Sequence, residues 1–134
     1  MAAGPGRAMV IKIGDGASPE VFTAVAGARI DGIRINNELV NVSDKTAAAR
    51  KLLDGGGEVS WSMNISGIYL DNAQVVLLRT KAGNGALTNF ELDVHTFGTY
   101  SGSFQVQNYE ENGDYNGAIT FSATMESSAA VTYA

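Results

Sequence analysis

Hydrophobic and polar residues alternate along most of this chain, which is the pattern of β-strands with one buried face. The clearest example is EVSWSMNIS (58–66), where apolar side chains occupy every second position. The same period of two recurs in TNFELDVH (88–95), YSGSFQVQNY (100–109) and AITFSATME (118–126). Shorter apolar runs predict further strands at 9–13, 21–25, 28–36, 38–42 and 129–134.

One segment has the signals of a helix instead. Asp71 is a good N-cap residue, and Gln74 follows three residues later, as in a capping box. Gly83 suits the C-terminal cap, so we expect a helix over 71–83. Spacing of i, i+3 and i+4 predicts that one stripe packs against the sheet, formed by Ala73, Val76, Leu77 and Thr80.

Two irregularities interrupt the strand pattern. In ARIDGIRIN, Ile30 and Ile33 fall on opposite phases with Asp31-Gly32 between them, which predicts a β-bulge. The segment 43–57, SDKTAAARKLLDGGG, has helix-forming residues but is short and ends in three glycines. We expect a long loop with at most one or two helical turns, and long loops in compact domains tend to be functional.

These elements predict a mainly β protein: an antiparallel β-sandwich or barrel flanked by one α-helix. The 134 residues suit a single domain over 1–134, and 45% apolar with 17% charged residues is a globular composition. The absence of cysteine excludes disulfides, zinc–thiolate sites and cysteine nucleophiles. The N-terminal apolar run is interrupted by Lys12, so we expect an intracellular product without a membrane segment.

The charge distribution argues against a protein that grips nucleic acid. The net charge is −5, and every Lys and Arg lies at or before Lys81. From residue 58 onward the polar faces of the predicted strands carry Ser, Thr, Asn, Gln and acids, with no Lys or Arg. Such faces cannot neutralise phosphates and would weakly repel them.

The acidic stretch NYEENGDYNGAITF (108–121) raises the question of a metal loop or a catalytic pair. With Gly117 at position 6 of a calcium loop, position 12 is Ala123, where a bidentate Glu is required. Glu110 and Glu111 are adjacent, so on a strand they point to opposite sides, unlike paired catalytic acids. The Asn-Gly-type signals favour a β-hairpin turn.

Other catalytic sites find little support. His95 is the only histidine, which excludes a three-histidine metal site, and it falls on the polar phase of a predicted strand. We interpret it as a surface or interface residue. No GxGxxG or P-loop is present, and DGGGEVS leads into a strand rather than a helix. The sequence therefore predicts no enzyme, cofactor or metal.

The order of the elements resembles one family over nearly the whole chain. Its telling pieces are KIGDG…F…VAG…I near the start, SGIY before the helix and GSFQV…YE…GDYNGAITFSATMESS near the end. Together they resemble the major tail tube protein of long-tailed phages and related gene transfer agents. A type VI secretion tube or a tail-completion ring would be a near relative of this class.

The resemblance implies a structural protein of a virion or particle tail, made in the cytoplasm of the bacterial host. Family members form six-membered rings that stack around a tape measure protein into a hollow tube joined to other tail proteins. DNA leaves through the lumen without specific binding. Neighbouring subunits join their inner sheets, while the N-terminal arm (1–8), the long loop (43–57) and the C-terminal segment contact other rings.

Two sets of residues follow as candidates. The polar strand faces lead us to expect lumen-facing positions at Glu58, Ser60, Ser62, Asn64, Ser66, Gln105, Gln107 and Glu126. The clustered cations and length of the loop lead us to expect ring-stacking contacts at Lys45, Arg50, Lys51, Leu52 and Leu53.

The alternative function is a monomeric β-sandwich binding module for carbohydrate or a baseplate partner. Such a module should expose aromatic side chains on a sheet face. Trp61, Phe90, Phe104 and Phe121 fall on apolar phases and are expected in the core. The aromatic residues that remain possible are Tyr69, Tyr100, Tyr109 and Tyr115.

Overall fold

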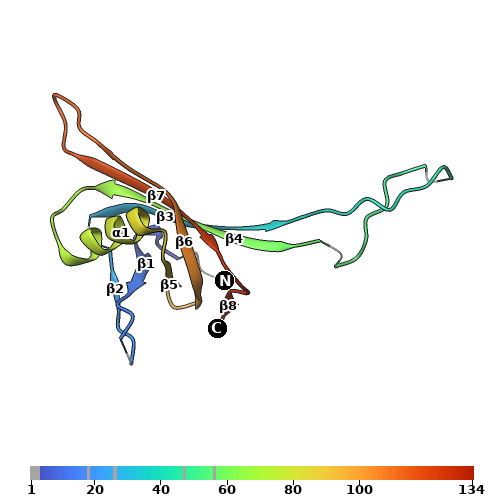
Figure 1. Cartoon of the computed structure of the whole chain (residues 1–134), viewed down its shortest axis with the longest axis horizontal. Helices are drawn as coiled ribbons and strands as arrows, with labels where there is room; N and C mark the ends of the chain where they lie inside the picture. Colours follow the sequence, from blue (N-terminus) through green and yellow to red (C-terminus); the bar gives the residue numbers. More distant parts are fainter. Residues whose placement is uncertain (1–3, 18, 26, 47, 56) are drawn as a thin grey trace.

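The computed structural model describes residues 4–134 except 18, 26, 47 and 56. It contains one eight-stranded antiparallel sheet with a single helix against it (Figure 1). The spatial order is β2-β1-β5-β6-β7-β4-β3, with β8 pairing β6. The elements are a 3₁₀ turn η1 Gly6–Ala8, β1 Met9–Gly14, β2 Phe22–Ala24, β3 Ala28–Asn37, β4 Val59–Ile68, α1 Ala73–Asn84, β5 Leu87–Val94, β6 Gly98–Asn112, β7 Thr120–Ser127 and β8 Thr132–Tyr133.

The prediction of a mainly antiparallel β protein flanked by one helix is confirmed. The sheet curls so that β1, near one end of the strand order, approaches β3 at the other end. Next to the first paired residues of β3 and β4, the backbone N–H of Ile68 donates to the carbonyl of Gly27, at 3.0 Å. The curl gives the sheet a concave face, which encloses the core.

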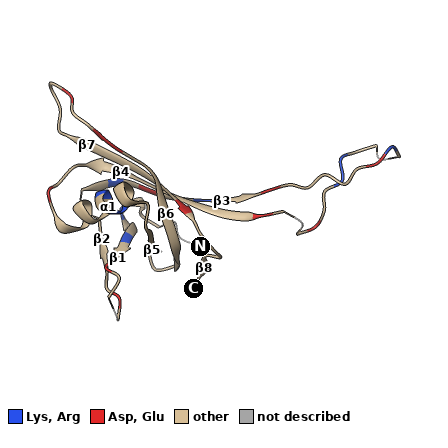
Figure 2. Cartoon of the chain, in the orientation of Figure 1, with Lys and Arg blue, Asp and Glu red and all other residues tan. Residues whose placement is uncertain are grey.

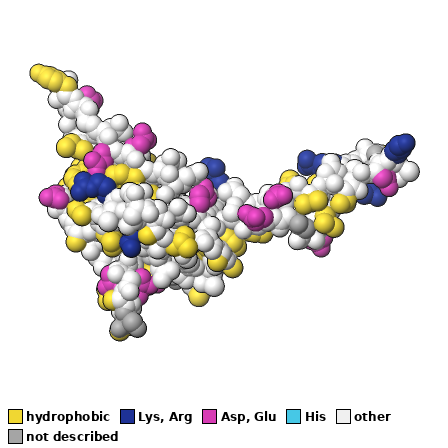
Figure 3. Space-filling model, in the orientation of Figure 1, with side chains coloured by type: hydrophobic (Ala, Val, Ile, Leu, Met, Phe, Trp, Pro, Cys, Tyr) yellow, Lys and Arg dark blue, Asp and Glu magenta, His cyan; other side chains and the backbone are white. Residues whose placement is uncertain are grey.

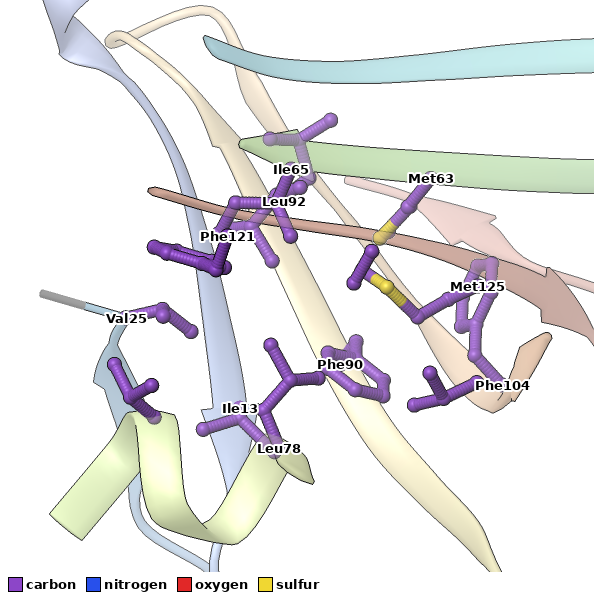
Figure 4. Close-up of a cluster of buried hydrophobic side chains, with 14 residues drawn as sticks. Ile13, Val25, Met63, Ile65, Leu78, Phe90, Leu92, Phe104, Phe121 and Met125 are labelled. Carbon is purple, nitrogen blue, oxygen red and sulfur yellow. The ribbon is translucent and has the colours of Figure 1, made fainter. Parts of the chain in front are cut away.

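The core is built from the apolar residues of the alternating strands (Figure 4). Phe90 on β5 and Phe104 on β6 meet edge to face, with ring centroids 6.1 Å apart, a favourable aromatic geometry. Met63 and Ile65 of the predicted strand 58–66 are fully buried. Val59, in the same alternation, is exposed because it lies beyond the region that the core covers.

The helix exists where it was expected, but its caps and packed face were predicted wrongly. The N-cap is Asn72, whose Oδ1 accepts from the N–H of Val75 at 3.1 Å, and not Asp71. The C-terminal cap is Gly85, whose φ of 67° is left-handed, and not Gly83.

The residues of α1 that the core buries are Val75 and Leu78. Leu77 is partly buried against the core, whereas Ala73, Val76 and Thr80 are exposed. The Thr80 hydroxyl donates to the carbonyl of Val76 on that exposed side, at 2.8 Å. Apolar residues occur on more than one side of this helix, so i, i+3 spacing alone did not determine which side meets the sheet.

The predicted bulge in β3 lies earlier than expected. The pairing of β3 with β4 shifts between Ala28 and Ile30 and is then regular to Asn37. Ile30 and Ile33 do face opposite sides, since Ile30 is exposed and Ile33 packs against the core. Glycine at position 32 is explained by close packing rather than by a bulge, because a Cβ there would lie 2.6 Å from Oδ1 of Asn64.

A carboxylate sits on the core side of β3. Asp31 lies opposite Ile65, and its Oδ1 is buried without a hydrogen-bond partner among the described residues. Burial raises the pKa of Asp31 to about 6, although a hydrogen bond from the backbone of Ile11 opposes this shift. Ionised Asp31 therefore opposes folding at neutral pH.

Truncation of Leu78 tests which face of α1 is packed. We expect Leu78→Ala to lower the free energy of unfolding by about 2–4 kcal/mol, since it leaves a cavity in the core. The matched change Val76→Ala, on the exposed side, should cost less than about 1 kcal/mol. Urea denaturation measures both, and equal losses would contradict the packing described.

Replacement of Asp31 tests the buried carboxylate. Because its folded-state pKa is raised above the unfolded value, the destabilisation that Asp31 causes should be small near pH 4 and grow as pH rises to about 7. We expect Asp31→Asn to gain about 1–2 kcal/mol at pH 8, after allowance for solvent screening, and little at pH 4. Asp71→Asn, at an exposed position, is the control. Parallel pH profiles for wild type and Asp31→Asn would refute this.

Candidate functional site

The face of β4, β7 and β6 that points away from the core carries small polar side chains, and we call it the polar face. The strand register places Ser62 opposite Glu126, and Glu126 opposite Gln105. Ser62 Oγ donates to Glu126 Oε2 at 2.5 Å, a charge-assisted hydrogen bond. Three of the predicted lumen-facing residues thus form one row across three strands.

The other predicted lumen-facing residues divide into two groups. Asn64 and Ser66 continue the polar face opposite Thr124 and Ser122. Gln107 occupies the register shift of β6 and lines a shallow hollow with Gln105 and Glu126.

Ser60 and Glu58 lie beyond the stretch of β4 that pairs with β7. Ser60 faces Asn36 of β3, and the carbonyl of Glu58 accepts from the N–H of Glu38 at 2.8 Å. The structure therefore brings six of the eight residues together and places Glu58 and Ser60 apart from them.

Arginine on β3 also reaches this surface, which the sequence analysis overlooked. Arg34 lies opposite Ser62 on β4, on the polar phase of its strand. Arg29, at the β3 bulge, borders a hollow of the same face with Ser66 and Asn112. The strands from residue 58 onward do lack Lys and Arg, but the face that they share with β3 does not. The signal was present in IRIN, where Arg34 alternates with two isoleucines.

The described residues of 38–57 extend the β3–β4 hairpin beyond the sheet as a long projection, which we call the arm (Figure 1). Its two sides are held by backbone bonds, from the N–H of Val42 to Lys51 at 3.0 Å and from the N–H of Leu53 to Val40 at 2.8 Å. The predicted helical turns are absent from its described residues. The expected strand at 38–42 is reduced to an isolated bridge between Asn41 and Leu52.

The cations and the apolar side chains of the arm occupy different parts of it. The three cations of the predicted stacking loop, Lys45, Arg50 and Lys51, are exposed toward its far end (Figure 2). Nearer its root lies a hollow of about 440 Å³, whose apolar lining residues are Leu39, Leu52, Leu53 and Val59. These four side chains are 41–59% exposed. A contiguous exposed apolar surface of this kind marks an interaction site.

The acidic stretch forms the predicted hairpin, because β6 and β7 pair on either side of it. At its turn the N–H of Gly117 donates to the carbonyl of Asp114 at 3.1 Å. Glu111 Oε1 accepts from the Tyr109 hydroxyl at 2.9 Å and from Arg79 of α1 at 3.4 Å, which links the hairpin base to the helix. Burial and the Glu111 carboxylate raise the pKa of Tyr109.

His95 lies in the turn after β5 rather than on a strand, with a φ of 51°. It is exposed, and its ring packs edge to face against Phe97 at 5.5 Å. The described residues contain no group of three His, Cys, Asp or Glu side chains able to hold a metal ion. Of the predicted N-terminal arm, residues 1–3 lie outside the described residues, and the carbonyl of Ala8 accepts from the N–H of His95 at 3.2 Å.

The tyrosines differ in exposure, and two of them pack together, since the ring centroids of Tyr100 and Tyr133 are 4.6 Å apart. Tyr69, Tyr100 and Tyr109 are partly buried against the core, and only Tyr115, at the hairpin turn, projects fully into solvent. No helix within the described part of the chain is long and apolar enough to span a membrane.

Comparison with known proteins agrees with this geometry. The chain is similar to a subunit in the tail of an empty gene transfer agent particle with C6 symmetry. The two share 27% identity over 98% of this chain and 99% of the other, with a TM-score of 0.91. A chain of a native gene transfer agent virion gives 26% identity, the same coverages and a TM-score of 0.88.

More distant likeness concerns the fold alone. The SPP1 tail tube structure shares 15% identity over 96% of this chain and 77% of that chain, with a TM-score of 0.78. No curated protein sequence matches the chain. The family model described as phage tail tube protein matches residues 3–133. The chain belongs to the phage tail tube protein family.

Proposed function

We propose that this chain, acting as one tail-tube domain, assembles into six-membered rings that stack into a hollow conduit for DNA. The observation that carries the proposal is the structural similarity, over nearly the full length of both chains, to a subunit of a C6-symmetric gene transfer agent tail. The subunit would be made in a bacterial host cytoplasm and reside in a virion or particle tail, around a tape measure protein.

Two features of the fold support self-assembly. β2 and β3 end the strand order, and no other strand of the described chain pairs with their outer edges. Exposed strand edges promote aggregation of a monomer, but their unpaired backbone groups can form hydrogen bonds when neighbouring subunits join their sheets. The arm adds a second surface, whose cations and apolar hollow suit contact with the next ring.

The polar face is our candidate for the lumen wall. Its serines and amides are uncharged and Glu126 is acidic, so this row neutralises no phosphate, which suits passage without tight binding. Arg34 adds positive charge beside that row. A lumen with both signs of charge would attract DNA less than a purely basic one and repel it less than a purely acidic one.

The alternative, a monomeric binding module for carbohydrate or a baseplate partner, has less support. A sugar-binding sheet needs several exposed aromatic rings, and among the described strand residues only Tyr133, on the short β8, has an exposed ring, at 52%. The family is structural, and we propose no enzymatic activity for this chain.

Electron microscopy of the purified protein over a concentration series tests assembly. We expect hollow tubes that lengthen with concentration, because a heterologous ring-to-ring contact does not close. Deletion of residues 46–53, the outer part of the arm, should abolish tubes but leave far-UV circular dichroism unchanged, since these residues lie outside the sheet. Full-length tubes from the deletion variant would rule out stacking through the arm.

Charge reversal tests the lumen. We expect Glu126→Lys to slow DNA delivery by assembled particles, because each ring would gain six cations facing the phosphates. Glu126→Gln retains an acceptor for Ser62 without adding a cation and should deliver DNA nearly as wild type. Glu58→Lys, at the arm root, should affect assembly more than delivery. Intact tubes of Glu126→Lys with unchanged delivery would exclude the polar face from the lumen wall.

A further inference from the structure

Two projections leave the body of the molecule at opposite ends. The arm forms one, and the β6–β7 hairpin around residues 110–119 forms the other (Figure 1). Both carry exposed hydrophobic side chains, which Figure 3 shows at the end of the hairpin and along the arm. Because they point away from each other, they cannot meet within one chain.

The hairpin combines apolar and acidic groups. Tyr115 at its turn is 93% exposed, and Ile119 is 54% exposed. Glu110 and Asp114 are exposed and take no part in the ion pairs that the described residues form. Glu111, by contrast, is already engaged by Arg79. Residues 82–134 contain no Lys or Arg, so the hairpin carries no cation of its own.

The arm has the complementary character in the reverse order along its length. Its far end carries Lys45, Arg50 and Lys51, and the ion pairs of the described residues use none of these cations. The apolar hollow lies nearer the root and has Glu38 and Asp54 among its lining residues, which can accept from a tyrosine hydroxyl. Two such projections laid side by side in opposite directions would match apolar tip to hollow and acids to cations.

We propose that the β6–β7 hairpin of one subunit docks along the arm of a second copy, with Tyr115 in the hollow and Glu110 and Asp114 facing Arg50 and Lys51. This inference rests on the proposed stacking and names the surface that receives the arm. Asp114 directly precedes Tyr115, and Lys51 directly precedes Leu52 of the hollow's lining, so Tyr115 in the hollow would bring Asp114 near Lys51. The contact joins different surfaces of the two copies, and such a heterologous contact can repeat from ring to ring without closing.

Engineered disulfides test the contact directly, because the chain has no cysteine of its own. Asn116→Cys with Asp54→Cys places thiols beside Tyr115 and on the rim of the hollow while retaining both apolar partners. We expect oxidation of assembled protein to give a ladder of covalent oligomers on non-reducing gels. Asn116→Cys with Val21→Cys, exposed on a different loop, is the matched control and should give no ladder.

The outcomes separate this inference from the proposed function. Tubes in the microscope without the ladder, or with an equal ladder from the control pair, would overturn the docking and leave the tube function intact. Absence of both tubes and ladder under all concentrations tested would count against both.

Charge exchange provides an independent readout. Arg50→Glu or Asp114→Arg alone should raise the concentration needed for assembly by about fivefold, since each places like charges across the contact. The double variant Arg50→Glu/Asp114→Arg should return this concentration to near the wild-type value. A double variant that assembles no better than either single variant would exclude the pairing.

Discussion

Burial of one face of a curled antiparallel sheet is the constraint on which the rest of this structure depends. Phe90, Phe104 and Phe121 contribute from three adjacent strands, and Leu78 closes the core from the helix. Because side chains alternate along a strand, burying one set of residues commits the other set to the opposite face. A register slip of one residue would exchange the two, so the core also positions the polar face.

That constraint explains where the functional surfaces lie. The core covers the concave side of the sheet. The other side, the outer edges of β2 and β3, and the two projections remain free for contacts with other molecules. α1 packs against the core, and the hydrogen bond from Arg79 to Glu111 connects this helix to the base of the β6–β7 hairpin. Exposed ion pairs of this type contribute little stability, at most about 1 kcal/mol, so apolar packing is the main source of rigidity.

The exposed apolar surface of the arm is costly in a free subunit. Leucine and valine side chains of the arm are exposed to water because the arm extends beyond the sheet that covers the core. Asp31 shows a related cost within the body, since a buried carboxylate oxygen lacks a partner in the isolated, described chain. Both features reduce the stability of the free subunit, and the proposed association with further copies would relieve the apolar cost.

Much of the fold could be predicted from the chain because strand alternation depends on neighbours only two residues apart. The strands at 58–66 and 118–126, the hairpin at 110–119 and the existence of the helix all rest on such local signals. The wrong predictions concern choices that local signals leave open. Val75 and Leu78, rather than Val76 and Thr80, meet the core because the sheet determines how the helix lies.

The division between sequence and tertiary structure is clearest at the proposed sites. Alternation by itself determined which side of β4 and β7 is polar, and composition determined that their residues carry no cations. Only strand pairing placed Arg34 beside Ser62, because β3 is distant in sequence and reaches that face through hydrogen bonds between strands. Likewise, the described helix-forming residues at the far end of the arm lie in turns and bends, and backbone hydrogen bonds join the two sides of the arm behind them, because so short a helix is marginal on its own.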